Sequence, residues 1–237
     1  MLKQRPKPQS SSLGLIAHED QSRQGATAGR AGNSREDGRL GDSSLPPARS
    51  IPRILSAPDT QHHIVVSTRD QKLAILDRGN LLATYPVSTS KFGLGDRPGS
   101  RFTPLGQLQI AEKIGDNAPP GAVFKDRRRT GEIVLANSPG RDPIVTRILW
   151  LRGRESQNAN AFGRDIYIHG TPEEWKIGSP ASYGCVRMRS SDIVQLYGIV
   201  GVGAAVTIVN MPLATAVPGL VTAHSMSAAN PAPFVMR

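Results

Sequence analysis

Residues 165–188 read DIYIHGTPEEWKIGSPASYGCVRM, and they hold Cys185, the only cysteine of the 237-residue chain. The stretch opens with DIYIHG, which is typical of a β-strand and ends in a histidine and a glycine, His169 and Gly170. A polar connection with glycine and proline follows and leads to Cys185. A single thiol cannot form an internal disulfide, so Cys185 is either a small buried hydrophobe or a reactive group.

Short β-rich runs separated by turns surround this stretch. Residues 63–76 and 79–89 are predicted to form two strands that are joined by a turn containing Gly79 and Asn80. Further strands are predicted at 106–113, 131–137, 145–152, 165–170 and 203–209. Together they predict a mainly β fold, a β-rich mixed sandwich with one or two short helices, over residues 59–211.

The best helix signal is SSDIVQLYG, residues 190–198. Ser190 or Ser191 can cap the first turn, and Asp192 suits the positive end of the helix. Gly198 can end the helix.

The two ends of the chain differ in composition from the β domain. Residues 1–58 are rich in Ser, Gly, Pro and Arg and lack a long apolar run, so we expect a disordered basic tail. Residues 212–237 contain Pro and Ala, and we expect a poorly ordered C-terminal extension. A secretory signal needs an apolar stretch of roughly 7–15 residues, which the sequence does not show, and we expect no transmembrane segment.

The formal net charge of +10 favours anionic partners, and nucleic acid is the usual first candidate. The basic residues are scattered, apart from Lys125 and residues 127–129, and they do not interleave with aromatic residues that could stack on bases. We therefore expect a solvated basic surface and no nucleic-acid partner. No histidine or acidic cluster has the spacing of metal ligands, so we expect neither a metal site nor a cofactor.

A cysteine nucleophile needs a base and hydrogen-bond donors that receive the oxyanion. His169 is the candidate base, because it ends a predicted strand beside Gly170. The successive N–H groups of Tyr183, Gly184 and Cys185 could converge as an oxyanion hole. The residues alone leave two interpretations open: a Cys–His acyl-transfer site, or a cysteine and a histidine with structural roles.

The motifs HGT at 169–171 and IGSPASYGCVRM at 177–188 resemble the active-site signature of the L,D-transpeptidase catalytic domain, also called the YkuD domain. The hairpin over residues 62–89 is similar to the opening strands of that family, and RFTPLGQLQI resembles its TPxG segment. LYGIVGVGAAVTIV is similar to its closing helix and strand. The resemblance covers about residues 62–210 and implies a YkuD-like sandwich, with residues 59–211 as the catalytic domain.

The resemblance also implies a reaction. Cys185 would attack the peptide bond after the meso-diaminopimelate residue of a peptidoglycan tetrapeptide stem and release the terminal D-alanine. His169 would activate the thiol and later deprotonate the incoming amine, and the Gly170 carbonyl would orient the imidazole. The diaminopimelate amine of a second stem would accept the acyl group, which forms a 3→3 cross-link.

The remaining motif residues are implied to bind substrate or to order the loop. The backbone of Tyr183, Gly184 and Cys185 would hold the oxyanion. Ser182 would order the loop or contact the substrate, and Arg187 would order the loop or meet a substrate carboxylate. Tyr183 stands where most members of the family have histidine, and we expect it to preserve activity while it changes the rate, the acceptor choice or the pKa of the thiol.

The implied partners are donor and acceptor stem peptides, and the implied location is the cell envelope, on the cell-wall side of the membrane. The implied process is peptidoglycan synthesis, and we expect a monomer. Two alternatives stay open: an L,D-carboxypeptidase, in which water takes the acyl group, and a non-catalytic wall-binding protein. The sequence does not separate transpeptidase from carboxypeptidase, because that difference lies in the access of the acceptor and the exclusion of water.

Overall fold

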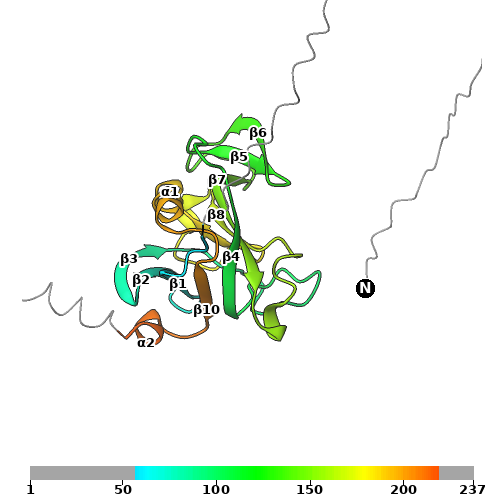
Figure 1. The fold of residues 1–237 in the computed structure, drawn as a ribbon. Helices are drawn as coiled ribbons and strands as arrows, with labels where there is room; N and C mark the ends of the chain where they lie inside the picture. Colours follow the sequence, from blue (N-terminus) through cyan, green and yellow to red (C-terminus); the bar gives the residue numbers. More distant parts are fainter. Residues whose placement is uncertain (1–56, 219–237) are drawn as a thin grey trace, which may run out of the picture. The chain divides into compact units, whose positions relative to one another are not determined.

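The computed structural model describes residues 57–218, whose ten strands form one mixed sheet (Figure 1). The strands are β1 His62–Ser67, β2 Lys72–Asp77, β3 Asn80–Pro86, β4 Gly106–Ile114, β5 Ala122–Lys125, β6 Arg128–Ile133, β7 Ile144–Gly153, β8 Tyr167–Gly170, β9 Val186–Met188 and β10 Ala205–Val209. The helices in this range are α1 Ser190–Ile199, α2 Leu213–Ala216 and the 3₁₀ helices η1 Ser156–Asn158 and η2 Glu174–Lys176. The predicted β-rich mixed fold with one or two short helices is confirmed, and the structure has two α-helices in this range.

The sheet runs in the order β3-β2-β1-β10-β4-β7, and β7 also pairs with β8, which in turn pairs with β9. The pairs β1–β10 and β8–β9 are parallel. The hairpin of β5 and β6 is attached to β7 and extends beyond the rest of the sheet (Figure 1). At the far end, Ser88 follows β3 and exchanges two backbone hydrogen bonds of 2.9 Å with Arg187 of β9. The sheet therefore closes on itself at β9.

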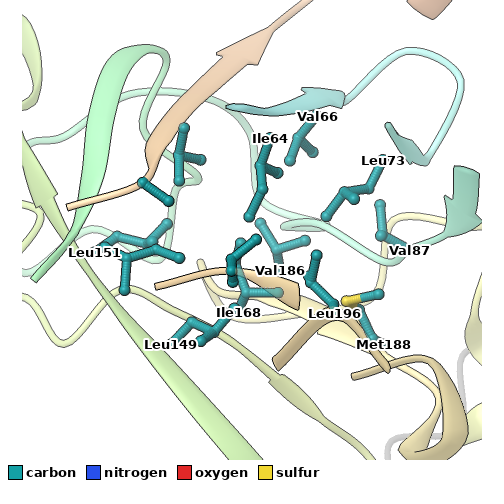
Figure 2. Packing of buried hydrophobic residues seen from close by; sticks show 14 of the residues in the cluster. Ile64, Val66, Leu73, Val87, Leu149, Leu151, Ile168, Val186, Met188 and Leu196 are labelled. Atoms are coloured by element: carbon teal, nitrogen blue, oxygen red, sulfur yellow. The ribbon is translucent and has the colours of Figure 1, made fainter. Parts of the chain in front are cut away.

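The main hydrophobic core lies inside this closed sheet. Because side chains alternate between the two faces of a strand, Ile64 and Val66 of β1 point into the core together. Ile168 of β8 and Val186 of β9 belong to the same cluster, and Leu196 of α1 adds to it (Figure 2). The core thus fixes β8 and β9, the two strands that flank the candidate site.

The opposite face of β8 and β9 carries the candidate site. Tyr167 belongs to a separate buried cluster, and Cys185 packs against that cluster. His169 alternates with Ile168 along β8 and therefore points away from the main core. In the parallel register His169 lies opposite Arg187, so both side chains share this second face.

The prediction of a single strand over residues 63–76 is wrong. This stretch forms β1 and β2, because residues 68–71 make a turn in which Gln71 adopts a φ of +51°. The buried amide of Gln71 donates to the Thr68 carbonyl oxygen at 2.6 Å and stabilises the turn. The hairpin predicted between residues 63–76 and 79–89 is confirmed as β2–β3, with Arg78 and Gly79 both at positive φ.

Two other elements differ from their predictions. The strand predicted over residues 131–137 is replaced by β6, which ends at Ile133. Helix α1 begins at Ser190, but neither Ser190 nor Ser191 caps it. The carboxylate of Glu174, from η2, accepts the Ser190 N–H at 2.8 Å instead. A cap that comes from a distant segment cannot be read from the local sequence.

The first residues of the predicted C-terminal extension, 212–218, lie within the described range. Leu213 and Val217 form a small cluster with Val65 and Ala74, so α2 packs on β1 and β2. Residues 219–237 of the extension, and the predicted tail apart from residues 57 and 58, lie outside the described residues. Within residues 57–218, no helix is long and apolar enough to cross a membrane.

Candidate active site

His169 is fixed near the end of β8. The side chain is 5 % exposed, and its Nδ1 lies 2.8 Å from the carbonyl oxygen of Gly170. A carbonyl oxygen only accepts hydrogen bonds, so Nδ1 carries the hydrogen and Nε2 keeps its lone pair. Burial lowers the pKa of His169 to about 4, so the imidazole is neutral at neutral pH. The side chain therefore presents a basic nitrogen in a defined tautomer.

Gly170 is needed at its position for steric reasons. A Cβ there would lie 2.7 Å from the carbonyl oxygen of Val145 on the paired strand β7. A larger residue would push β8 away from β7. The carbonyl oxygen that orients His169 thus belongs to a tightly packed backbone.

Cys185 stands directly before β9 and is partly buried. Its thiol donates to the Asp165 carbonyl oxygen and accepts the Tyr167 N–H, each at 3.4 Å. Burial raises the pKa of the Cys185 thiol to about 11. The thiol is therefore protonated at neutral pH.

The parallel pairing of β8 with β9 brings the thiol and the imidazole to one face. His169 lies opposite Arg187, and Cys185 precedes Arg187 by two residues. Tyr167 likewise precedes His169 by two residues, and its N–H contacts the Cys185 sulfur. Residues two apart share a face in extended backbone, so the register places His169 on the face of β8 and β9 that is turned away from the main core, where Cys185 packs against the second cluster.

Hydrogen bonds within and across segments fix the loop before Cys185. The Ser182 hydroxyl donates to the Cys185 carbonyl oxygen at 2.6 Å and accepts the Gly184 N–H at 3.2 Å. The Thr103 hydroxyl donates to the Gly184 carbonyl oxygen at 2.9 Å. Gly184 has a φ of +129°, and a Cβ there would lie 3.2 Å from the carbonyl oxygen of Phe102. Glycine permits both the backbone conformation and the close approach.

Arg187 joins this site to the closure of the sheet. The side chain is 2 % exposed, and its guanidinium donates to the Ser88 hydroxyl at 3.2 Å. It also donates to Glu173 Oε2 at 3.0 Å and to the carboxylate of Asp142. Asp142 in turn accepts the Thr171 hydroxyl at 2.5 Å. The guanidinium therefore holds two loops against β9.

These partners of Arg187 were not identified from the sequence. Asp142 and Ser88 lie in loops far from the motif, and no local pattern marks them. The sequence feature that could have indicated such partners is Arg187 itself, which stands between the apolar residues Val186 and Met188. A buried arginine requires paired acids, but the sequence does not say which acids they are.

The structure brings the predicted site residues together around the start of β9. They are His169 and Gly170 at the end of β8, Arg187 in β9, and the loop residues Ser182, Tyr183, Gly184 and Cys185. The Tyr183 side chain differs from the others because it is 57 % exposed. In the described part of the chain, no group of His, Cys, Asp or Glu is arranged to hold a metal ion.

Comparison with known proteins finds similar sequences that belong to one family. Residues 61–208 match the sequence profile of the L,D-transpeptidase catalytic domain, YkuD. The chain is 31% identical over 171 residues to "Probable L,D-transpeptidase YbiS" of Escherichia coli, a match that covers 69% of this chain and 50% of that protein. It is 29% identical over 169 residues to "Probable L,D-transpeptidase YcfS" of the same species, with coverages of 69% and 49%. The chain thus spans about half the length of these curated relatives.

A solved structure of an L,D-transpeptidase from Mycobacterium tuberculosis also matches. Its TM-score is 0.41 and its sequence identity is 15%, over 63% of this chain and 58% of that chain.

Replacing Arg187 by methionine is expected to lower the free energy of unfolding by about 3–5 kcal/mol, because it leaves largely buried carboxylates without their partner. Chemical denaturation at pH 7 measures this loss. Arg141 is the matched control, since its ion pair with Glu132 is exposed. Arg141→Met should cost less than about 1 kcal/mol. Equal losses in the two variants would show that the Arg187 pairs do not hold the site.

The rate at which iodoacetamide alkylates Cys185 is expected to rise with pH up to about pH 11. Only the thiolate reacts, and burial raises the pKa of this thiol to about 11. At pH 7 the rate should lie roughly 100-fold below that of a cysteine in a short peptide. The measurement reads one site, because the chain has one cysteine. A rate that already levels off below pH 9 would contradict the buried environment described for the thiol.

Proposed function

The chain belongs to the L,D-transpeptidase catalytic domain family, and we propose that it transfers peptidyl groups between peptidoglycan stem peptides through an acyl-enzyme on Cys185. The orientation of His169 carries this proposal. Its Nδ1 is engaged by the Gly170 carbonyl oxygen, which leaves Nε2 as a base on the face of the sheet that bears the thiol. Cys185 and His169 are the proposed catalytic residues, and Gly170 positions the imidazole.

The first half-reaction starts from a neutral pair. The pKa of the Cys185 thiol is raised and that of the His169 imidazole is lowered, so the proton stays on sulfur until substrate binds. As Sγ attacks the carbonyl carbon of the bond after diaminopimelate, the proton passes to Nε2 of His169. The imidazolium then protonates the leaving nitrogen of D-alanine as the C–N bond breaks. The product is a thioester on Cys185.

The oxyanion formed in this step needs donors near the loop. The Gly184 N–H already donates to the Ser182 hydroxyl, so we assign the N–H groups of Tyr183 and Cys185 to the oxyanion. Gly184 contributes its positive φ, which lets successive N–H groups form a concave nest. Ser182 is a positioning residue, because its hydroxyl also bonds the Cys185 carbonyl oxygen.

Arg187 is also a positioning residue in this proposal. Its guanidinium is 2 % exposed and already faces the carboxylates of Asp142 and Glu173, which argues against a contact with a substrate carboxylate. It holds β9 beside β8 and thereby sets the spacing of Cys185 and His169.

The second half-reaction transfers the acyl group to an acceptor. An amine of a second stem attacks the thioester carbon, His169 takes a proton from that amine, and the C–S bond breaks to regenerate the thiol. A diaminopimelate amine as acceptor gives a 3→3 cross-link. The proposed setting is the cell-wall side of the membrane, where stem peptides occur, with the protein acting as a monomer without a cofactor.

The test is the reaction of purified protein with diaminopimelate-type disaccharide-tetrapeptides, followed by mass spectrometry of the products. We expect release of D-alanine and formation of 3→3 dimers. Cys185→Ala should abolish both, and His169→Gln should slow both about 100-fold or more, because a general base typically contributes that much. His62→Gln is the matched control, since His62 lies in β1 and pairs with Asp59.

Each other outcome has a defined meaning. Dimers made by Cys185→Ala would contradict the proposed nucleophile. Tripeptide without dimers would identify the L,D-carboxypeptidase alternative, in which water takes the acyl group. No product from folded wild-type protein would favour the wall-binding alternative.

A further inference from the structure

Two exposed aromatic rings and two basic side chains adjoin the loop that carries Cys185. Phe92 is 43 % exposed and Tyr183 is 57 % exposed, and their ring centroids lie 5.3 Å apart. Lys91 Nζ lies 4.9 Å and the Arg101 guanidinium carbon 5.1 Å from the centroid of the Tyr183 ring. We refer to Lys91, Phe92, Arg101 and Tyr183 as the basic-aromatic patch.

The patch stands on backbone segments that bond to one another. The Lys91 N–H donates to the Ser182 carbonyl oxygen at 3.2 Å, and Ser90 and Ser182 form a parallel bridge. The Ser90 hydroxyl donates to the Arg101 carbonyl oxygen at 2.5 Å. These bonds connect both basic residues to the loop of Cys185. The patch is therefore held at a fixed place on the loop that leads to Cys185.

No ion pair with an acid of the described residues balances the positive charge of the patch. Within residues 57–218, neither Lys91 nor Arg101 has an ion-pair partner. Asp96 is the one acidic residue between them in the sequence, and it is buried and paired with Arg164 at 2.5 Å. Among the described residues, two cations without an ion-pair partner therefore adjoin the loop that carries Cys185.

Each cation also lies against both rings. Lys91 Nζ is 5.2 Å and the Arg101 guanidinium carbon 5.4 Å from the centroid of the Phe92 ring. Contacts of this kind keep a long basic side chain over an apolar surface while its charged group stays available to a ligand. The combination suits a ligand that presents a carboxylate next to an apolar portion.

We propose that the basic-aromatic patch binds a carboxylate-bearing part of the donor stem peptide. Lys91 and Arg101 bind the carboxylate, and Phe92 and Tyr183 provide an apolar platform for the adjoining part of the peptide. This inference rests on the proposed function and adds a specificity site outside the Cys–His pair. It also gives Tyr183 a role in binding, in which the ring matters and the hydroxyl does not.

The experiment measures binding of the disaccharide-tetrapeptide by calorimetry, in a Cys185→Ala background so that no turnover occurs. The double variant Lys91→Gln/Arg101→Gln is expected to bind about tenfold more weakly, since each exposed charge contact contributes up to about fivefold. Arg78→Gln/Lys125→Gln is the matched control, because it removes two exposed positive charges elsewhere. The control should bind as the parent does.

A tetrapeptide with amidated carboxylates identifies the group that is recognised. Amidation should weaken binding to the parent about tenfold but should weaken binding to the double variant little further. This is the expected result when the ligand carboxylate and the two cations contact each other, because removing either side already removes the interaction. If the double variant loses the same factor with free and amidated peptides, the cations contact another part of the ligand, such as the sugar, and the proposal is wrong. Equal binding by the double variant and its control would also overturn it.

Tyrosine variants test the platform. Tyr183→Phe should bind as the parent does, while Tyr183→Ala should bind several-fold more weakly because it removes the ring from the patch. A loss of binding in Tyr183→Phe as large as in Tyr183→Ala would overturn the role of the ring.

The outcome is separable from that of the proposed function. If wild-type protein forms dimers but binding does not depend on Lys91 and Arg101, this inference fails and the proposed function stands. If binding depends on both residues but wild-type protein gives no product, the inference stands and the catalytic proposal fails.

Discussion

The buried guanidinium of Arg187 is the constraint on which the site depends. A charge taken out of water must be paired, and Arg187 meets this requirement with Asp142 and Glu173, which come from two separate loops. Its backbone pairs with Ser88 and closes the sheet. The same residue, Arg187, therefore closes the sheet and fixes the position of β9. Because Cys185 directly precedes β9, the position of its thiol beside β8 follows from the same pairing.

Burial has opposite effects on the pKa values of the two proposed catalytic groups but favours the neutral form of both. It lowers the pKa of His169 and raises that of the Cys185 thiol. A neutral pair reacts slowly with solutes and becomes a nucleophile when a carbonyl group and its oxyanion donors are in place. The exposed charges of Lys91 and Arg101 lie outside this low-dielectric region. In the account proposed above, binding and chemistry therefore use different parts of the same loop system.

Local pattern was sufficient to predict β4, β7 and α1. Short β-rich runs between glycine, proline or polar residues indicated the two strands, and the helix start and stop signals of SSDIVQLYG indicated the helix. Local pattern was insufficient for β9, because its three residues are too few to show an alternation of apolar and polar side chains. The motif residues Cys185 and His169 could be named in advance, because His169 ends a predicted strand beside Gly170 and Cys185 follows Gly184 in a polar turn, within motifs that resemble the YkuD signature. Asp142 and the neighbours of Tyr183 could not, because their contacts join segments far apart in the sequence.

The most direct test of the central claim is the intact mass of the protein after it is mixed with disaccharide-tetrapeptide and quenched in acid. The account predicts an adduct whose mass equals that of the donor less one alanine, located on Cys185 by peptide mapping and absent from Cys185→Ala. Product formation without any covalent adduct under rapid quenching, or an adduct on another residue, would contradict the acyl-enzyme mechanism.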